Sequence, residues 1–296
     1  MNGNPSDSFY ESTDALRLYC RVYPAQRPGG LPVLCLPGLT RNSRDFVELA
    51  THLSAHRDVM TPDLRGRGRS AWDPDSSHYQ LPTYVQDAWS LIEAHGLARV
   101  LVIGTSLGAL IGMVMAAMKP DRIAGLVLNE AGPEIDPTGL RRIAAYAGKL
   151  PSVSSWTEAG AQAKSIYGLA LPGLTDEEWL DYAHRGYREN ANGIPVPDVD
   201  PRISDAFKTP PTAPAHMWPL YAQIKGVPMM VLRGALSDLL SAATVERMAR
   251  EKPDLQHITV ANRGHAPLLN EPECVAAIDA FVAQHGRDAQ AMASQG

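Results

Sequence analysis

The sequence predicts an α/β fold in which a mostly parallel sheet is flanked by helices and interrupted by a helical insertion. Three observations lead to this prediction. Over residues 16–128, short apolar segments typical of strands alternate with amphipathic segments typical of helices. The alternation returns over 227–285, whereas 132–221 has helical patterns without strands between them. Alternation of this kind is typical of a parallel sheet that carries helices on both faces.

The predicted strands are short and rich in apolar residues. The first alternates in character along the chain, as a half-buried strand does, and the second and fourth are continuous apolar runs typical of the interior of a parallel sheet. In chain order the predicted strands are 16–23, 31–36, 58–62, 100–103, 123–128, 227–232 and 257–260.

The predicted helices divide into two groups. Those of the core have one apolar stripe, and the helix over 84–95 stops at Gly96. The core helices are 45–55, 84–95, 109–118, 242–250 and 275–285, and those of the insertion are 140–149, 159–167 and 177–187. We therefore assign 1–132 and 222–296 to a core domain and 133–221 to an inserted cap.

The composition excludes several classes of protein. The chain has 296 residues and a net charge of −5, and no Lys/Arg block indicates a nucleic acid or an anionic membrane as partner. Cys20, Cys35 and Cys274 are too few and too far apart for a disulfide framework or a zinc site. No apolar stretch reaches the roughly 18 residues of a membrane span, and the first residues lack a secretion signal. We expect a cytoplasmic protein, and the sequence does not indicate its oligomeric state.

The strongest functional motif is Gly104-Thr-Ser-Leu-Gly108, a G-x-S-x-G run between a predicted buried strand and a predicted helix. A serine at the tip of such a turn has strained backbone, and the glycines on either side prevent collisions across it. The amino end of the following helix favours a developing negative charge. The motif predicts that Ser106 is a nucleophile. The alternative interpretation is a glycine-rich turn that matches the motif by chance.

A serine nucleophile needs a base, and among nine histidines we favour His265. It lies in Arg263-Gly-His-Ala-Pro267, just after the predicted strand 257–260. Parallel sheets place their sites in loops at the carboxyl ends of strands. His52, His56, His78, His95 and His285 lie in helices or polar loops, and His184 and His216 lie in the predicted cap.

Two carboxylates compete for the role of the acid that orients His265. Asp238 follows the predicted strand 227–232, which gives the chain order Ser, Asp, His that this kind of site follows. Its alternative role is that of a helix N-cap. Glu130 ends the strand after the nucleophile helix and can reach the same histidine. We favour Asp238 because of the chain order.

The oxyanion formed during such a reaction needs two amide donors. The amide of Leu107 follows the nucleophile directly. The second donor is expected in the loop after strand 31–36, where Pro37 and Gly38 allow a close approach of the backbone, and we assign it to the amide of Leu39.

Taken together, these motifs resemble those of the capped α/β-hydrolases. Asp63-Leu-Arg-Gly-Arg-Gly-Arg-Ser70 looks like the D-x-R-G-x-G-x-S signature of that family. The other matching motifs are Leu36-Pro-Gly-Leu39, Gly104–Gly108, Leu232-Arg-Gly-Ala-Leu-Ser-Asp238 and Gly264-His265. The resemblance implies an eight-stranded α/β-hydrolase sheet, and it implies that Arg65 fixes a loop or sits in a buried pair. Family members that use an aspartate nucleophile are disfavoured by Ser106.

The resulting hypothesis is an esterase that acts through an acyl-enzyme on a small-molecule ester, with no cofactor and no metal. Rival activities are a lactonase and a C–C bond hydrolase of ring-fission products. The latter needs a cationic anchor for a carboxylate, for which Arg41, Arg141 and Arg142 are candidates. A rival of another class is a hydrolase-fold ligand receptor.

Aromatic residues of the predicted cap are candidates for the substrate wall, namely Trp156, Trp179, Tyr182, Tyr187, Trp218 and Tyr221. Trp218 and Tyr221 are favoured because they lie where the cap returns to the core, and Trp156 is a further candidate. Their alternative role is packing within the cap or at its hinge. An apolar, aromatic-lined pocket is expected to suit small to medium apolar or aryl esters.

Overall fold

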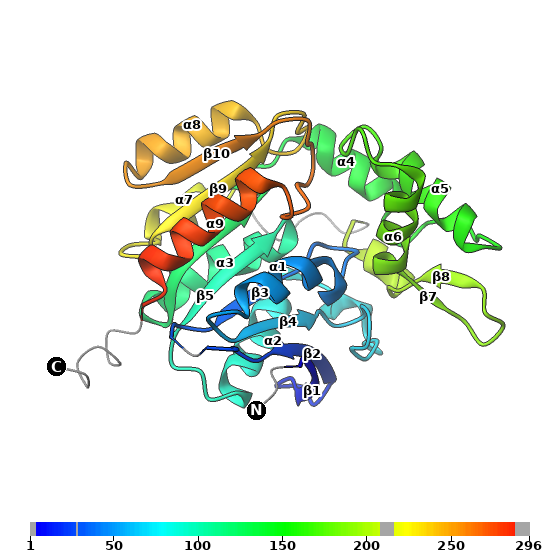
Figure 1. Cartoon of the computed structure of the whole chain (residues 1–296), viewed down its shortest axis with the longest axis horizontal. Coiled ribbons are helices and arrows are strands. Elements are labelled where there is room, and N and C mark those ends of the chain that lie inside the picture. The colour runs from blue at the N-terminus through cyan, green and yellow to red at the C-terminus, as the bar shows by residue number, and fades with distance from the viewer. Residues whose placement is uncertain (1–3, 28, 208–215, 288–296) are drawn as a thin grey trace.

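A computed structural model describes residues 4–27, 29–207 and 216–287. Its described part contains an eight-stranded sheet in the order β1-β2-β4-β3-β5-β6-β9-β10, with β1–β2 and β2–β4 antiparallel and the other neighbours parallel (Figure 1). The strands are β1 (Ser6–Glu11), β2 (Arg17–Tyr23), β3 (Val33–Leu36), β4 (Val59–Asp63), β5 (Val100–Thr105), β6 (Ile123–Asn129), β9 (Met229–Gly234) and β10 (Gln256–Val260). The predicted mostly parallel, eight-stranded sheet is confirmed.

Helices cover both faces of this sheet, and alternate strand residues point to the two faces. In β3, Leu34 packs with the cluster that includes α2, α3, α7 and α8, whereas Cys35 packs with the cluster that includes α1 and α9. The core helices are α1 (Val47–Leu53), α2 (Leu81–Ala94), α3 (Leu107–Met118), α7 (Trp218–Gln223), α8 (Ala242–Glu251) and α9 (Pro272–His285). Short 3₁₀ turns span Ser43–Phe46, Ser76–His78, Pro120–Arg122 and Pro201–Phe207. No helix in the described ranges combines the length and the apolar character needed to cross a bilayer.

The sequence did not indicate β1, which forms the outer edge of the sheet. Of its six residues only Tyr10 is buried, and the others include serine, aspartate and glutamate. These polar residues are poor strand formers, so the segment has no apolar pattern to reveal it. Its pairing with β2 supplies the structure that its composition does not.

Between β6 and β9 the chain leaves the sheet and forms a separate group of elements. These are α4 (Pro137–Tyr146), α5 (Trp156–Tyr167), α6 (Asp176–Gly186) and the hairpin of β7 (Tyr187–Glu189) and β8 (Pro195–Pro197). In Figure 1 they lie together at one end of the molecule, away from both termini. We call this group the cap; the exact boundaries of 133–221 stay a prediction.

Polar contacts fasten the cap to the loop that follows β3. The Asn42 amide group and Arg44 Nε both donate to the carbonyl of Arg185 at the end of α6, at 2.9 and 3.0 Å. Arg44 Nη2 also binds the Asp198 carboxylate at 2.6 Å. The cap is therefore positioned directly over the loop that carries Leu39.

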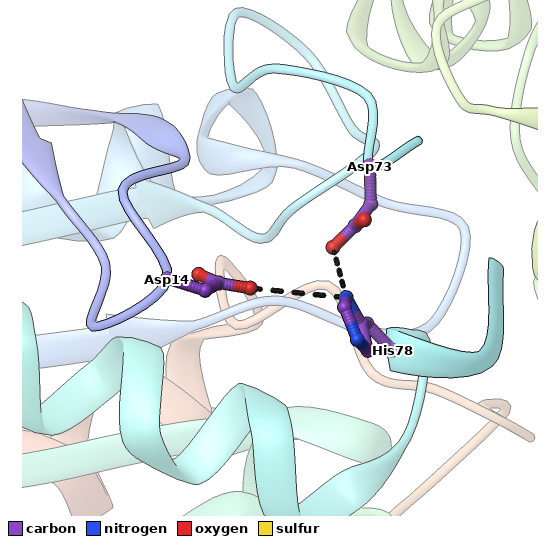
Figure 2. A group of neighbouring side chains, drawn as sticks. All are labelled: Asp14, Asp73 and His78. Carbon is purple, nitrogen blue, oxygen red and sulfur yellow. Dashed lines mark hydrogen bonds and ion pairs between the residues drawn. The ribbon is translucent and has the colours of Figure 1, made fainter. Parts of the chain in front are cut away.

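Arg65 occupies the loop-fixing role that the resemblance implied. Its guanidinium is buried and binds the carboxylates of Asp14, Asp73 and Asp87. Figure 2 shows that Asp14, Asp73 and His78 gather at one point, with His78 Nδ1 3.0 Å from Asp73 and 3.8 Å from Asp14. Such a group can hold a metal ion, but the Arg65 guanidinium already supplies positive charge to both carboxylates. We assign the cluster to the stability of the loop.

Candidate active site

Ser106 stands at the strained turn between β5 and α3. Its backbone has φ 53° and ψ −114°, a region that residues with a side chain rarely occupy. A Cβ atom on Gly104 would lie 2.4 Å from the Ala109 amide nitrogen, and one on Gly108 would lie 2.0 Å from the Leu36 carbonyl oxygen. The glycines at both positions are therefore required sterically, as the motif predicts. Strain of this kind persists where the surrounding fold enforces it, often at functional sites.

His265 lies in the loop after β10, and it lines the same cavity as Ser106. Two hydrogen bonds fix this loop. The Asn129 amide group donates to the Pro267 carbonyl at 3.0 Å, and the Gly264 amide donates to the carbonyl of Ala170 in the cap at 2.6 Å. The histidine is thus tied both to the end of β6 and to the cap.

The Nδ1 atom of His265 lies 3.4 Å from Oε2 of Glu130. Glu130 is fully buried at the end of β6. Its carboxylate also accepts hydrogen bonds from the Gly234 amide at 2.5 Å and from the Ser237 hydroxyl at 2.6 Å. A buried carboxylate is costly unless donors surround it, and these two hold this one facing the imidazole. The contact leaves Nε2 as the ring nitrogen available to a serine.

Asp238 has a different partner. Both of its carboxylate oxygens accept hydrogen bonds from Arg142 of α4, at 2.6 and 2.7 Å. The hydrogen bonds from Arg142 lower the pKa of the Asp238 carboxyl below its ordinary value. In the described ranges it makes no hydrogen bond to His265. A cap arginine thus binds the Asp238 carboxylate, whereas the Glu130 carboxylate contacts the histidine. Which of the two acids orients His265 stays a prediction.

The two predicted oxyanion donors lie in suitable segments. Leu107 is the first residue of α3, where backbone amides have no partner within the helix. Leu39 lines the Ser106 cavity, and its carbonyl accepts a 2.8 Å hydrogen bond from the buried Arg67. That bond turns the carbonyl toward Arg67 and fixes the loop. The donor role of both amides stays a prediction.

Two adjoining cavities lie between the core and the cap. The one that contains Ser106 has a volume of about 80 Å³. The second has a volume of about 360 Å³ and shares five lining residues with the first, so the two adjoin. The shared residues are Thr40, Arg41, Tyr146, Tyr167 and Tyr182.

Trp218, Tyr221 and Trp156, the aromatic residues favoured from the sequence, line neither of these cavities. Trp218 and Tyr221 belong to α7, which packs on α3 of the core. The Trp218 indole donates to Glu134 at 2.8 Å, and the Tyr221 hydroxyl donates to the carbonyl of Met248 at 3.1 Å. Both side chains are buried in core packing, their alternative role.

Trp156 also serves packing within the cap. Its ring lies on that of His184, with centroids 3.8 Å apart, and its indole donates to Glu189 at 3.0 Å. Tyr146, Tyr167 and Tyr182 are the aromatic residues that line both cavities. Their rings contact in sequence, with centroid distances of 5.5 and 5.2 Å. The sequence analysis included Tyr182 among the cap aromatics but missed Tyr146 and Tyr167, which are the last residues of the amphipathic helices α4 and α5.

The cavity around Ser106 also contains two arginines. Arg41 and Arg185 line it, and Arg41 lines the larger cavity as well. Arg185 pairs with Glu48, whereas Arg41 pairs with Asp45 and lies over the Tyr182 ring at 4.2 Å. Of the other candidate anchors, Arg142 is held by Asp238, and Arg141 is exposed and lines neither cavity.

Comparison with known proteins gives the class that this fold and site define. A family model described as the alpha/beta hydrolase fold matches residues 32–272, and the chain belongs to this family. Its hydrolase relatives indicate hydrolase activity on small molecules.

The chain is also similar to individual proteins of known name or structure. The chain is 34% identical over 291 residues to a 3-hydroxybutyrate-oligomer hydrolase of Cupriavidus necator, covering 95% of this chain and 99% of that protein. It is 26% identical to a 2-(acetamidomethylene)succinate hydrolase of Mesorhizobium japonicum, covering 81% and 83% of the two chains. A crystal structure of an alpha/beta hydrolase from Novosphingobium aromaticivorans superposes with a TM-score of 0.88 at 41% identity, covering 96% of this chain and 99% of that one.

Proposed function

We propose that the protein is a serine hydrolase that cleaves the carboxylic ester bonds of short hydroxy-acid oligoesters. One observation carries this proposal. Ser106, in strained backbone, lines the same cavity as His265, whose Nδ1 lies 3.4 Å from the buried Glu130 carboxylate. Nucleophile, base and orienting acid are the three parts that acyl transfer through a serine requires.

The reaction then proceeds in two halves. His265 takes the Ser106 hydroxyl proton as Oγ bonds to the ester carbonyl carbon, and the oxyanion is stabilised by the amides of Leu39 and Leu107. The carbon–oxygen bond to the alcohol breaks, and His265 gives its proton to the departing alcohol. Water next loses a proton to His265 and attacks the acyl-enzyme. Ser106 leaves, recovers its proton, and the acid is released.

The relatives and the cavity support the substrate class. The Cupriavidus necator relative, which aligns with this chain over 99% of its own length, is named a hydrolase of 3-hydroxybutyrate oligomers. The units of such an oligomer are joined by ester bonds. The cavity at Ser106 has Ile143 and Leu268 in its wall and so offers apolar contacts to a short acyl group. This refines the sequence-based expectation of apolar or aryl esters toward short, polar-ended ones.

The experiment measures turnover of p-nitrophenyl butyrate and of the linear 3-hydroxybutyrate dimer by monitoring the release of product. The Ser106→Ala variant is the control. The proposal predicts hydrolysis of both substrates and its loss in Ser106→Ala. Binding of the dimer without turnover would instead favour the hydrolase-fold receptor.

A second candidate is the C–C bond hydrolase, because Arg41 is the cationic anchor that such a substrate requires. A ring-fission diketo acid in the same assay tests it. Turnover of that substrate with inactivity on both esters would replace the ester-hydrolase proposal.

A further inference from the structure

We propose that Arg41 binds the free carboxylate of the substrate, so that the enzyme releases hydroxy acids from the carboxyl end of short oligoesters. This inference rests on the proposed function and adds which bond is selected. Arg41 becomes a specificity-determining residue, recognising the leaving group beside the nucleophile.

The first argument is proximity to Ser106. A Cβ atom built on Gly38 would lie 3.7 Å from Arg41 Cγ and 3.8 Å from Ser106 Cβ, so the separation of those two atoms cannot exceed the sum of these distances. Ser106 and Arg41 also line the same cavity. A substrate bound at Ser106 therefore lies in the cavity that Arg41 helps to form.

The second argument is the hydrogen-bonding capacity that Arg41 retains. An arginine has five N–H donors. Nε and Nη2 each donate to the Asp45 carboxylate, at 2.7 and 2.6 Å, whereas Nη1 donates to no residue in the ranges that the structure describes. Asp45 thus orients the guanidinium and leaves donors for a second carboxylate. An arginine fork binds carboxylates in a planar, two-point geometry.

The third argument is that the fold makes room for this guanidinium. A Cβ atom on Gly186 would lie 2.6 Å from Arg41 Nη1, so a side chain there would displace the arginine. On its other side, Tyr182 lies beneath the guanidinium. The Arg41 side chain is only 13% exposed. Ion pairs are stronger in such a water-poor setting than at the surface, where they contribute little.

The charges around Arg41 are consistent with one added anion. Arg185 lines the same cavity and is matched by Glu48, and Asp45 matches Arg41. Asp45 is itself a quarter exposed, so solvent screens part of its charge. A substrate carboxylate at Nη1 would share Arg41 with Asp45, as two carboxylates often share one guanidinium.

The chemistry of a hydroxy-acid ester fits this spacing. In a 3-hydroxybutyrate ester, one methylene separates the carboxylate from the carbon that bears the ester oxygen. The leaving group therefore spans a short distance between the reacting bond and its charged end. A longer chain that continues past Arg41 would lose the ion pair, so the free carboxyl end of an oligomer is selected.

The test compares kcat/KM for the free-acid 3-hydroxybutyrate dimer and for its methyl ester, which lacks the charge. The wild-type protein is expected to prefer the free acid roughly 10- to 100-fold, the range of a hydrogen-bonded charge pair. Arg41→Gln is expected to remove the preference and Arg41→Lys to keep part of it. Arg141→Gln, an exposed arginine outside both cavities, is the matched control and should keep all of it.

A second measurement covers the case in which Arg41→Gln does not fold. In wild-type protein, butyrate should inhibit hydrolysis of p-nitrophenyl butyrate competitively and more strongly than butanamide. Equal inhibition by the two, an equal kcat/KM for free acid and methyl ester, or a preference that persists in Arg41→Gln would overturn the inference while ester hydrolysis stands. Absence of hydrolysis of any ester would instead remove the proposed function itself.

Discussion

Glu130 follows β6 and His265 follows β10, and Oε2 of Glu130 lies 3.4 Å from Nδ1 of His265. The loop after β9, which carries Asp238, lies next to the end of β6 because β6 and β9 are paired. Two carboxylates therefore lie near one histidine. The Arg142 side chain, reaching from the cap, is what distinguishes them.

The first prediction concerns which carboxylate, Glu130 or Asp238, orients His265. Glu130→Gln keeps the shape of the side chain but removes the charge that stabilises a protonated imidazole. We expect kcat to fall roughly a thousandfold to ten-thousandfold, as when the orienting acid of a serine triad is neutralised. Asp238→Asn is the matched variant, and its kcat should stay within about tenfold of wild type. If Asp238→Asn is the more damaging of the two, the acid is Asp238 after all.

The second prediction concerns pH and stability. Hydrogen bonds from Arg142 hold the pKa of Asp238 below its ordinary value of 3.8. The pair therefore stabilises the fold above that value, and the contribution is lost as the pH falls below it. Asp238→Asn should be less stable than wild type at about pH 5 to 7, and the difference should shrink below about pH 4. Urea unfolding across this range measures it, and a difference that grows with acidity would contradict the assignment.

The third prediction concerns Arg67. Its buried guanidinium donates to the carbonyl of Leu39 and to the hydroxyl of Tyr84. Arg67→Met should free the loop that carries the proposed oxyanion donor and reduce kcat by about a hundredfold, since one such donor is worth about that much. KM should change less than kcat, because the donor acts on the oxyanion. A loss confined to KM would place Arg67 in substrate binding instead.

The fourth prediction concerns Trp218, which lies in the core. Trp218→Leu should destabilise the fold by about 2 to 4 kcal/mol, as large core truncations do. Relative kcat/KM values across p-nitrophenyl acetate, butyrate and hexanoate should keep their order. Tyr167→Leu, which changes the cavity wall, is the comparison and should alter that order. A changed chain-length profile in Trp218→Leu alone would return Trp218 to the substrate wall.

The sequence was sufficient for seven of the eight strands of the described sheet, for the core helices α1, α2, α3, α8 and α9, and for the elbow at Ser106. Their signals are local: apolar runs for buried strands, and two glycines whose positions leave no room for a Cβ. The edge strand β1 was missed because it buries a single side chain. Local composition cannot reveal an element whose stability comes from pairing with β2.

The residues of the site were harder to predict from the sequence, because they depend on contacts between residues that lie far apart in the chain. Chain order favours Asp238, and nothing near it in sequence reveals that Arg142 of α4 binds its carboxylate. Trp218 lies where the cap returns, yet α7 folds onto α3. Arg41 was one of three candidate anchors, and only the folded chain places it beside Ser106. Tertiary packing therefore determines which side chains of the cap line the cavity.

The most direct test of the central claim is covalent labelling of the intact protein with a fluorophosphonate, followed by peptide mass spectrometry. The probe reacts with a serine that an adjacent base activates. We predict a single adduct on Ser106, lost in Ser106→Ala and strongly slowed in His265→Ala. An unlabelled protein, or labelling that persists in Ser106→Ala, would contradict a serine nucleophile at this turn.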